Sequence, residues 1–133
     1  MVRSFNLDDT DERADLNNPV NQKIHQAAER MLIEYPGEIF LNLDRSMHPL
    51  FEGPAMDLVE RAIAMLSRSV GEALDDMLLR RIEAGITHGY LPSGLSGVNA
   101  KAHCGDAKIS VFITMQHVTG AAGCFEVEMP VEW

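Results

Sequence analysis

The sequence predicts an α+β domain of two layers, with two main helices packed on a small, mainly antiparallel sheet that ends in a C-terminal hairpin. Two observations carry this prediction. Apolar residues recur every three or four positions over about 19–35 and 55–84, as they do on one face of an amphipathic helix. Residues 108–133 are instead rich in β-branched side chains or alternate apolar and polar ones, which is the pattern of half-buried strands.

The first helix is expected to begin at Pro19, because Asn18-Pro19 matches a helix N-cap followed by proline in the first turn. Pro36-Gly37 would end it. The second helix carries the clearest apolar stripe in the chain, and Gly85 would end it. At about 1.5 Å per residue it would span about 45 Å, so either Gly71 marks a kink or break, or a partner subunit covers part of the stripe.

Short apolar or β-branched runs bounded by turn residues predict the strands. The final strand has Pro130, which cannot donate a ladder hydrogen bond and therefore favours an edge position. A hairpin loop over 119–123 would pair Val118 with Cys124. The expected strands are 38–43, 98–104, 108–118 and 124–133, and the expected loops are 44–54 and 85–97.

One domain is expected over 19–133, because 133 residues with 46% hydrophobic residues can fill one core but not two. Residues 1–18 are polar and acidic and predict a mobile N-terminal arm. No secretory signal and no run of about 18 apolar residues occurs, which predicts a cytoplasmic protein. The two cysteines, Cys104 and Cys124, are expected to be reduced thiols there.

The charge balance limits the class of partner. Eleven Lys and Arg stand against twenty Asp and Glu, for a net charge of -9, so direct binding to nucleic acid is not expected. The sequence also lacks phosphate-cradling, dinucleotide-binding and H-E-x-x-H patterns, and no cofactor is predicted.

Carboxylates on the final strand form the leading candidate site. Glu126, Glu128 and Glu132 share one face of that strand, with about 6.6 Å between the first two from the rise of about 3.3 Å per residue. They predict a contact for a cationic surface, and a charged strand that resists edge-to-edge pairing is the alternative explanation. The acidic residues Asp8, Asp9, Asp11 and Glu12 of the arm are included in the same predicted contact.

A metal site is a weak alternative. Its ligands would be His103, Cys104, His117 and Cys124, but no C-x2-C spacing brings two of them together, and His117 and Cys124 should face opposite sides of the sheet. No metal is therefore predicted.

An enzyme is another alternative, with His88 and Ser93 of the glycine-rich 85–97 loop as the reactive pair. Leu91 and Leu95 occupy the positions that a nucleophile elbow would fill with glycine. A connection that needs permissive backbone explains the glycines better, and no catalytic residue is predicted.

Taken together, these features favour a small, non-enzymatic interaction protein that neutralises a larger basic partner by stoichiometric binding. Immunity proteins and phage-encoded inhibitors of nucleic-acid-directed defence, some of which imitate nucleic acid, are of this type. The first alternative is an assembly subunit of a virion or another homo-oligomer, including a homodimer through the 55–84 helix. The second is a small cytoplasmic enzyme that uses the 85–97 loop.

Overall fold

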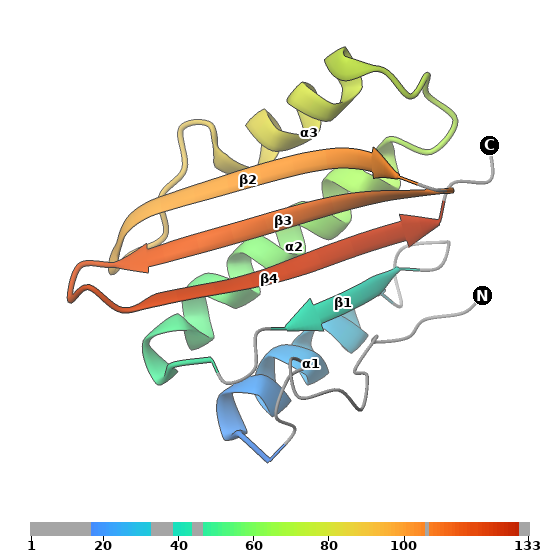
Figure 1. Ribbon diagram of the computed structural model, residues 1–133. Helices are drawn as coiled ribbons and strands as arrows, with labels where there is room; N and C mark the ends of the chain where they lie inside the picture. The colour runs from blue at the N-terminus through green and yellow to red at the C-terminus, as the bar shows by residue number, and fades with distance from the viewer. Residues whose placement is uncertain (1–16, 33–38, 44–46, 106, 131–133) are drawn as a thin grey trace.

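A computed structural model of the chain describes residues 17–32, 39–43, 47–105 and 107–130. Within these ranges, three helices and a short 3-10 turn pack on one face of a four-stranded antiparallel sheet of order β1-β4-β3-β2 (Figure 1). The predicted α+β two-layer fold is therefore confirmed. In chain order the elements are α1 (Pro19–Leu32), β1 (Phe40–Leu43), η1 (Pro49–Phe51), α2 (Glu52–Arg68), α3 (Asp76–Thr87), β2 (Leu95–Gly105), β3 (Lys108–His117) and β4 (Ala122–Pro130).

Helix α1 begins where the sequence predicts. Asn18 Oδ1 accepts hydrogen bonds from the backbone N–H groups of Val20 and Asn21, at 2.9 and 3.1 Å, and so caps the first turn. The described part of the helix ends at Leu32, so its predicted end at residue 35 lies outside the described residues, as does most of the predicted arm over 1–18.

Of the alternatives for the 55–84 stripe, the break at Gly71 is the one that the structure has: the stripe belongs to two helices, α2 and α3, separated by residues 69–75, and not to one continuous helix. Gly71 has a φ of 88°, in the left-handed region that glycine adopts without strain. Asp75 then starts α3, because its side chain accepts a hydrogen bond from the Leu78 N–H at 2.9 Å. The break lets α3 lie over β2, which a straight helix of about 45 Å could not do at 1.5 Å per residue.

Both predicted loops are shorter than expected. Helix α2 starts at Glu52, since Pro54 falls in its first turn, where a missing N–H costs nothing. The predicted 85–97 loop is in fact a connection over 88–94, because α3 continues to Thr87 and β2 begins at Leu95.

Arg61 of α2 fixes the end of α3. Its guanidinium donates hydrogen bonds to the carbonyl oxygens of Gly85 and Ile86, both at 2.9 Å, which are among the carbonyls that a helix end leaves without partners. The same group stacks over the Tyr90 ring at 4.2 Å, and the Tyr90 hydroxyl donates to Asp57 at 2.9 Å. These contacts hold the 88–94 connection against α2.

Strand β4 is not an edge strand, contrary to prediction, because it lies between β1 and β3. Pro130 is tolerated there because it is registered only with Lys108 of β3, beyond the Phe40–Glu128 pair that ends the β1 ladder.

The hairpin register also differs from the prediction, since Cys124 pairs with Thr114 and not with Val118. The two pairings differ by an even number of residues, so each side chain keeps its predicted face.

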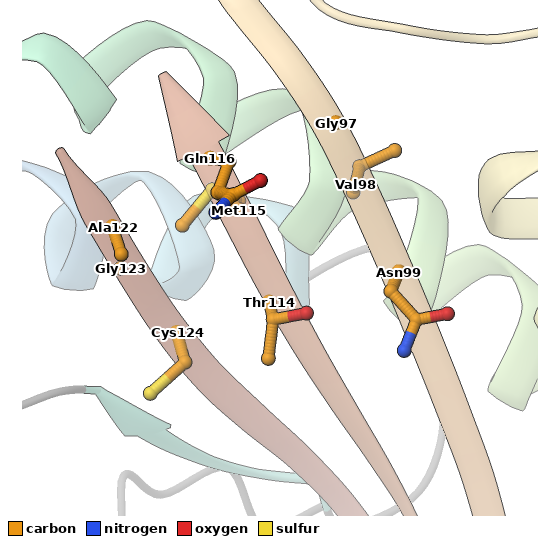
Figure 2. A pocket seen from close by; sticks show the side chains of 9 residues that line it. All are labelled: Gly97, Val98, Asn99, Thr114, Met115, Gln116, Ala122, Gly123 and Cys124. Carbon is orange, nitrogen blue, oxygen red and sulfur yellow. The ribbon is translucent and has the colours of Figure 1, made fainter. Parts of the chain in front are cut away.

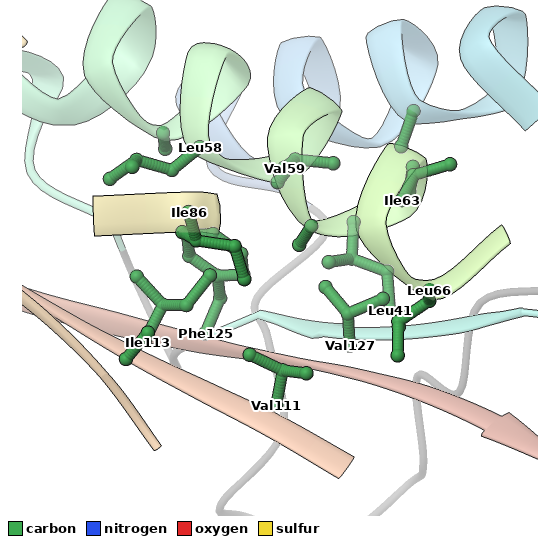
Figure 3. Close-up of a cluster of buried hydrophobic side chains, with 14 of the residues drawn as sticks. Leu41, Leu58, Val59, Ile63, Leu66, Ile86, Val111, Ile113, Phe125 and Val127 are labelled. Atoms are coloured by element: carbon green, nitrogen blue, oxygen red, sulfur yellow. The ribbon is translucent and has the colours of Figure 1, made fainter. Parts of the chain in front are cut away.

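The core fills the space between the helices and the sheet (Figure 3). In that layer Leu58, Ile63 and Leu66 of α2 meet Val111 of β3 and Val127 of β4, all at most 1% exposed. Most of the apolar stripe of the two helices is thus used within the chain's own core, but Val70, Leu74 and Met77 at and after the break are 53%, 40% and 79% exposed. None of the described helices combines the length and the apolar character needed to cross a bilayer.

Candidate interaction surface

The second face of the sheet is not covered by any described helix or strand (Figure 1). Strand alternation directs successive side chains of β3 to opposite faces. Val111 and Ile113 are fully buried under the helices, whereas Phe112 between them is 41% exposed. We call this second side of the sheet the open face. Phe112 thus places a partly exposed aromatic ring at the centre of the open face.

The strand register orders the open face into rows that run across the sheet. One row contains Lys101 of β2, Phe112 of β3, Glu126 of β4 and Asn42 of β1. The next row contains His103, Ser110, Glu128 and Phe40 in the same strand order. The carboxylates therefore lie on β4, and the basic side chains Lys101 and His103 lie on β2, with Phe112 between the two columns.

The two carboxylates of β4 are held by neighbours. The Asn42 side-chain amide donates to Glu126 Oε1 at 3.1 Å and to Glu128 Oε1 at 3.2 Å, and Lys108 Nζ lies 3.2 Å from Glu128 Oε2. Only 12% of the Glu128 side chain is exposed. The predicted row of carboxylates is thus a half-buried, hydrogen-bonded pair and not a fully solvated strand face.

Glu126 carries the less compensated charge of the two. Burial, the hydrogen bond to Glu128 and the charge of Glu128 raise the pKa of Glu126, while Asn42 and Lys108 lower it by less. A positive group brought to the open face would relieve the repulsion and lower this pKa again.

A hollow of about 550 Å³ adjoins the row of Phe112 (Figure 2). The side chains of Asn99, Thr114 and Cys124 lie side by side on β2, β3 and β4, and Gly97 and Ala122 leave the surface low beside them. The hollow has room for a protruding side chain of a partner. Its lining residues are Gly97, Val98, Asn99, Thr114, Met115, Gln116, Ala122, Gly123 and Cys124.

The outer edge of β2 is partly occupied by α3. Glu83 Oε2 accepts a hydrogen bond from the Ala102 backbone N–H at 2.8 Å. A carboxylate on an edge amide opposes the addition of another strand at that point. The open face, and not this edge, is therefore the better candidate for a contact.

The structure brings together Glu126 and Glu128, two of the residues that the sequence predicts for partner binding. The others, Glu132, Asp8, Asp9, Asp11 and Glu12, lie outside the described residues. Sequence reasoning missed Asn42, Lys108 and Phe112. Their signal was weak, because a strand period assigns Phe112 a face only after its register with neighbouring strands is known.

The negative charge of the chain is carried largely by other segments. The described residues contain ten Asp and Glu and eight Lys and Arg, against twenty and eleven in the whole chain. The open face is consequently bipolar and not uniformly acidic.

The structure does not assemble the alternative metal ligands. His117 lies on the helix side, with its ring centroid 6.2 Å from that of Phe51, whereas Cys124 faces the open side. His103 shares the open face but stands on β2, which is not adjacent to β4, and Cys104 follows it on the opposite side of the strand. Within the described ranges, no three His, Cys, Asp or Glu residues are grouped so that they could hold a metal ion.

His88 and Ser93, the pair of the enzyme alternative, are both exposed in the 88–94 connection. The backbone of His88 is used to end α3, since its N–H donates to the Ala84 carbonyl at 2.7 Å.

The open face is the surface on which a function can be argued, because it joins an exposed aromatic ring, a pair of mutually repelling carboxylates and a hollow. Comparison with known proteins adds no second argument. No family model, no curated protein and no solved structure matches this chain.

Proposed function

We propose that the protein is a small, non-enzymatic interaction protein that binds a larger basic partner stoichiometrically through the open face and thereby blocks it. Immunity proteins and phage-encoded inhibitors act in this manner. The single observation that carries the proposal is Phe112, which is 41% exposed and directly opposite Glu126 in the register of an uncovered sheet face.

An aromatic ring beside carboxylates suits an arginine or lysine side chain. The cation stacks on the ring face and its N–H groups donate to the carboxylate, and both interactions strengthen as water leaves the contact. Glu126 has the charge to offer, because the described cation that acts on it, Lys108, is already paired with Glu128 at 3.2 Å. The adjoining hollow would accept a second side chain of the same partner.

The first test uses defined probes. Isothermal titration of the full chain with an arginine-rich peptide should give binding that weakens as salt is raised, and a glutamate-rich peptide should give none. Phe112→Ala, and separately the double variant Glu126→Gln with Glu128→Gln, should reduce the affinity by about tenfold or more.

The matched control removes the same charge from the helix side. Glu29→Gln with Glu60→Gln changes two exposed residues on α1 and α2. This control should bind like the parent chain. Equal loss in the control and in the open-face variants would mean that net charge, and not the open face, governs binding, and the site would have to be abandoned.

A further inference from the structure

We infer that the open face also binds a second copy of the same chain, in a face-to-face dimer whose two-fold axis runs along β3 through Phe112. The observation behind this inference is the placement of charge on either side of β3. Acidic side chains lie on one neighbouring strand, β4, and basic ones lie on the other, β2.

A two-fold axis along β3 exchanges the two sides of the face. It places β4 of one copy over β2 of the other and keeps each row at its own level along the strands. Lys101 and Glu126 belong to one row, and His103 and Glu128 belong to the next. Each Glu126 therefore meets the Lys101 of the other copy, whereas Glu128, which is only 12% exposed and already paired with Lys108, adds no further contact. Such an interface is self-complementary, as a two-fold contact requires.

The centre of the contact is apolar. The two Phe112 rings, each 41% exposed, meet at the axis and gain an aromatic contact. Lys108 also lies on β3, but its charge is already balanced by Glu128 at 3.2 Å. The twist of each sheet, which sets aligned sheets about 30° apart, separates the two Lys108 side chains further.

The area of the face agrees with a weak dimer. Three strands of about 30–36 Å and the shorter β1 of about 13 Å, spaced about 4.8 Å apart, give roughly 540 Å² on each copy. The total of about 1,100 Å² lies just below the range of stable interfaces, as in weak, transient complexes, and we therefore expect micromolar dissociation.

The dimer rests on the charge pattern and does not require the proposed function. If both hold, they use the same face and exclude each other. The free protein would then be a dimer that a basic partner must separate, so the apparent affinity for the partner would fall as the protein concentration rises.

The test is sedimentation velocity of the full chain between about 1 and 200 µM, a range chosen around micromolar dissociation. The parent chain should sediment increasingly as a dimer. Lys101→Glu alone and Glu126→Lys alone should each raise the dissociation constant by at least about tenfold, because like charges then face each other.

Mixing these two variants separates the proposed geometry from a general loss of folding. In the mixed pair, the glutamate introduced by Lys101→Glu faces the lysine introduced by Glu126→Lys, and the unchanged Glu126 and Lys101 form the second contact. The heterodimer should therefore form although each variant alone is monomeric. Chains misfolded by the substitutions could not recover in this way. Glu29→Lys and Arg80→Glu make the same kinds of charge change on exposed helix residues and should leave dimerisation unchanged.

A parent chain that stays monomeric at the highest concentration would overturn the inference. A dimer that the two variants fail to weaken, or that the mixture fails to restore, would also overturn it. A monomer that binds the arginine-rich peptide would remove the dimer and leave the proposed function standing. A dimer of the expected symmetry that does not bind the peptide would support the dimer and remove the proposed function.

Discussion

The two faces of the sheet are built from the same strands but differ in how far their side chains are buried. Toward the helices, Val111, Phe125 and Val127 are at most 1% exposed and meet side chains from α2. Toward the open side, Phe112 and Glu126 stand one residue away from these positions on the same strands, and no described element covers them. The buried face supplies the stability of the fold, and the open face is available for contacts with another molecule.

The difference follows from strand alternation, which directs successive side chains of one strand to opposite faces of the sheet. Each pair of neighbouring residues in β3 or β4 contributes one side chain to the buried face and one to the open face. A substitution on the open face should therefore change association while leaving the fold intact, and a substitution on the buried face should do the opposite.

The largest effect is expected from truncating a phenylalanine on each face. Phe125→Ala should lower the free energy of unfolding by about 3–5 kcal/mol, because it leaves a cavity in a packed layer. Phe112→Ala should cost about 1 kcal/mol or less, since less apolar area is withdrawn from water. Chemical denaturation of both variants measures the two values, and similar losses would contradict the division between the faces.

The glycines of the sheet give a second matched pair. A Cβ on Gly123 would lie 3.1 Å from Met47 Sδ and from Phe51 Cδ2, whereas a Cβ on Gly97 meets nothing within 4 Å. Gly123→Ala should thus destabilise the protein by about 1–3 kcal/mol through overpacking. Gly97→Ala should stay within about 0.5 kcal/mol of the parent. The melting temperatures of both variants measure this difference. A Gly123→Ala variant that melts like the parent would contradict the expected overpacking.

A third experiment tests whether the N-cap of α3 contributes to the stability of the helical layer. Asp75→Ala removes the side-chain cap of α3 and should cost about 1 kcal/mol. Asp76→Ala, one residue along and exposed, is the control and should cost less. Equal effects in urea denaturation would mean that packing on β2 alone positions α3.

The smallest effect concerns Glu126. Because its pKa in the folded chain lies above its ordinary value of 4.5, the folded state holds its proton more tightly, and ionisation lowers stability as pH rises through the folded pKa. Glu126→Gln should therefore stabilise the chain near neutral pH by less than about 1 kcal/mol, the scale of partly exposed charge interactions. Below the ordinary pKa both chains carry a neutral side chain, so the gain should vanish. Thermal melts across pH measure it, and a gain that grows in acid would contradict the assignment.

Local signals in the sequence predicted much of the fold. Asn18-Pro19 marked the start of α1, and the apolar period of three and four residues identified the helical layer. The alternation in 124–133 assigned Glu126 and Glu128 correctly to one face of the last strand. These features depend on neighbouring residues, and so a single sequence carries them.

The remaining features depend on which segments meet in space. The apolar stripe of 55–84 continues across residues 69–75, so the sequence left both a break at Gly71 and a continuous helix open, and only the structure shows the break. Likewise, the insertion of β4 between β1 and β3 gave Glu126 and Glu128 their shared neighbour, Asn42, from a distant part of the chain.

The sequence by itself therefore determined the α+β class, the start of α1 and the faces of the last strand, because each rests on local periodicity or capping. Only the tertiary structure decided strand order, the choice between a continuous helix and a break at Gly71, and the row that joins Lys101, Phe112 and Glu126. Strand pairing joins residues far apart in sequence, and the free energy that selects it comes from burying whole layers at once.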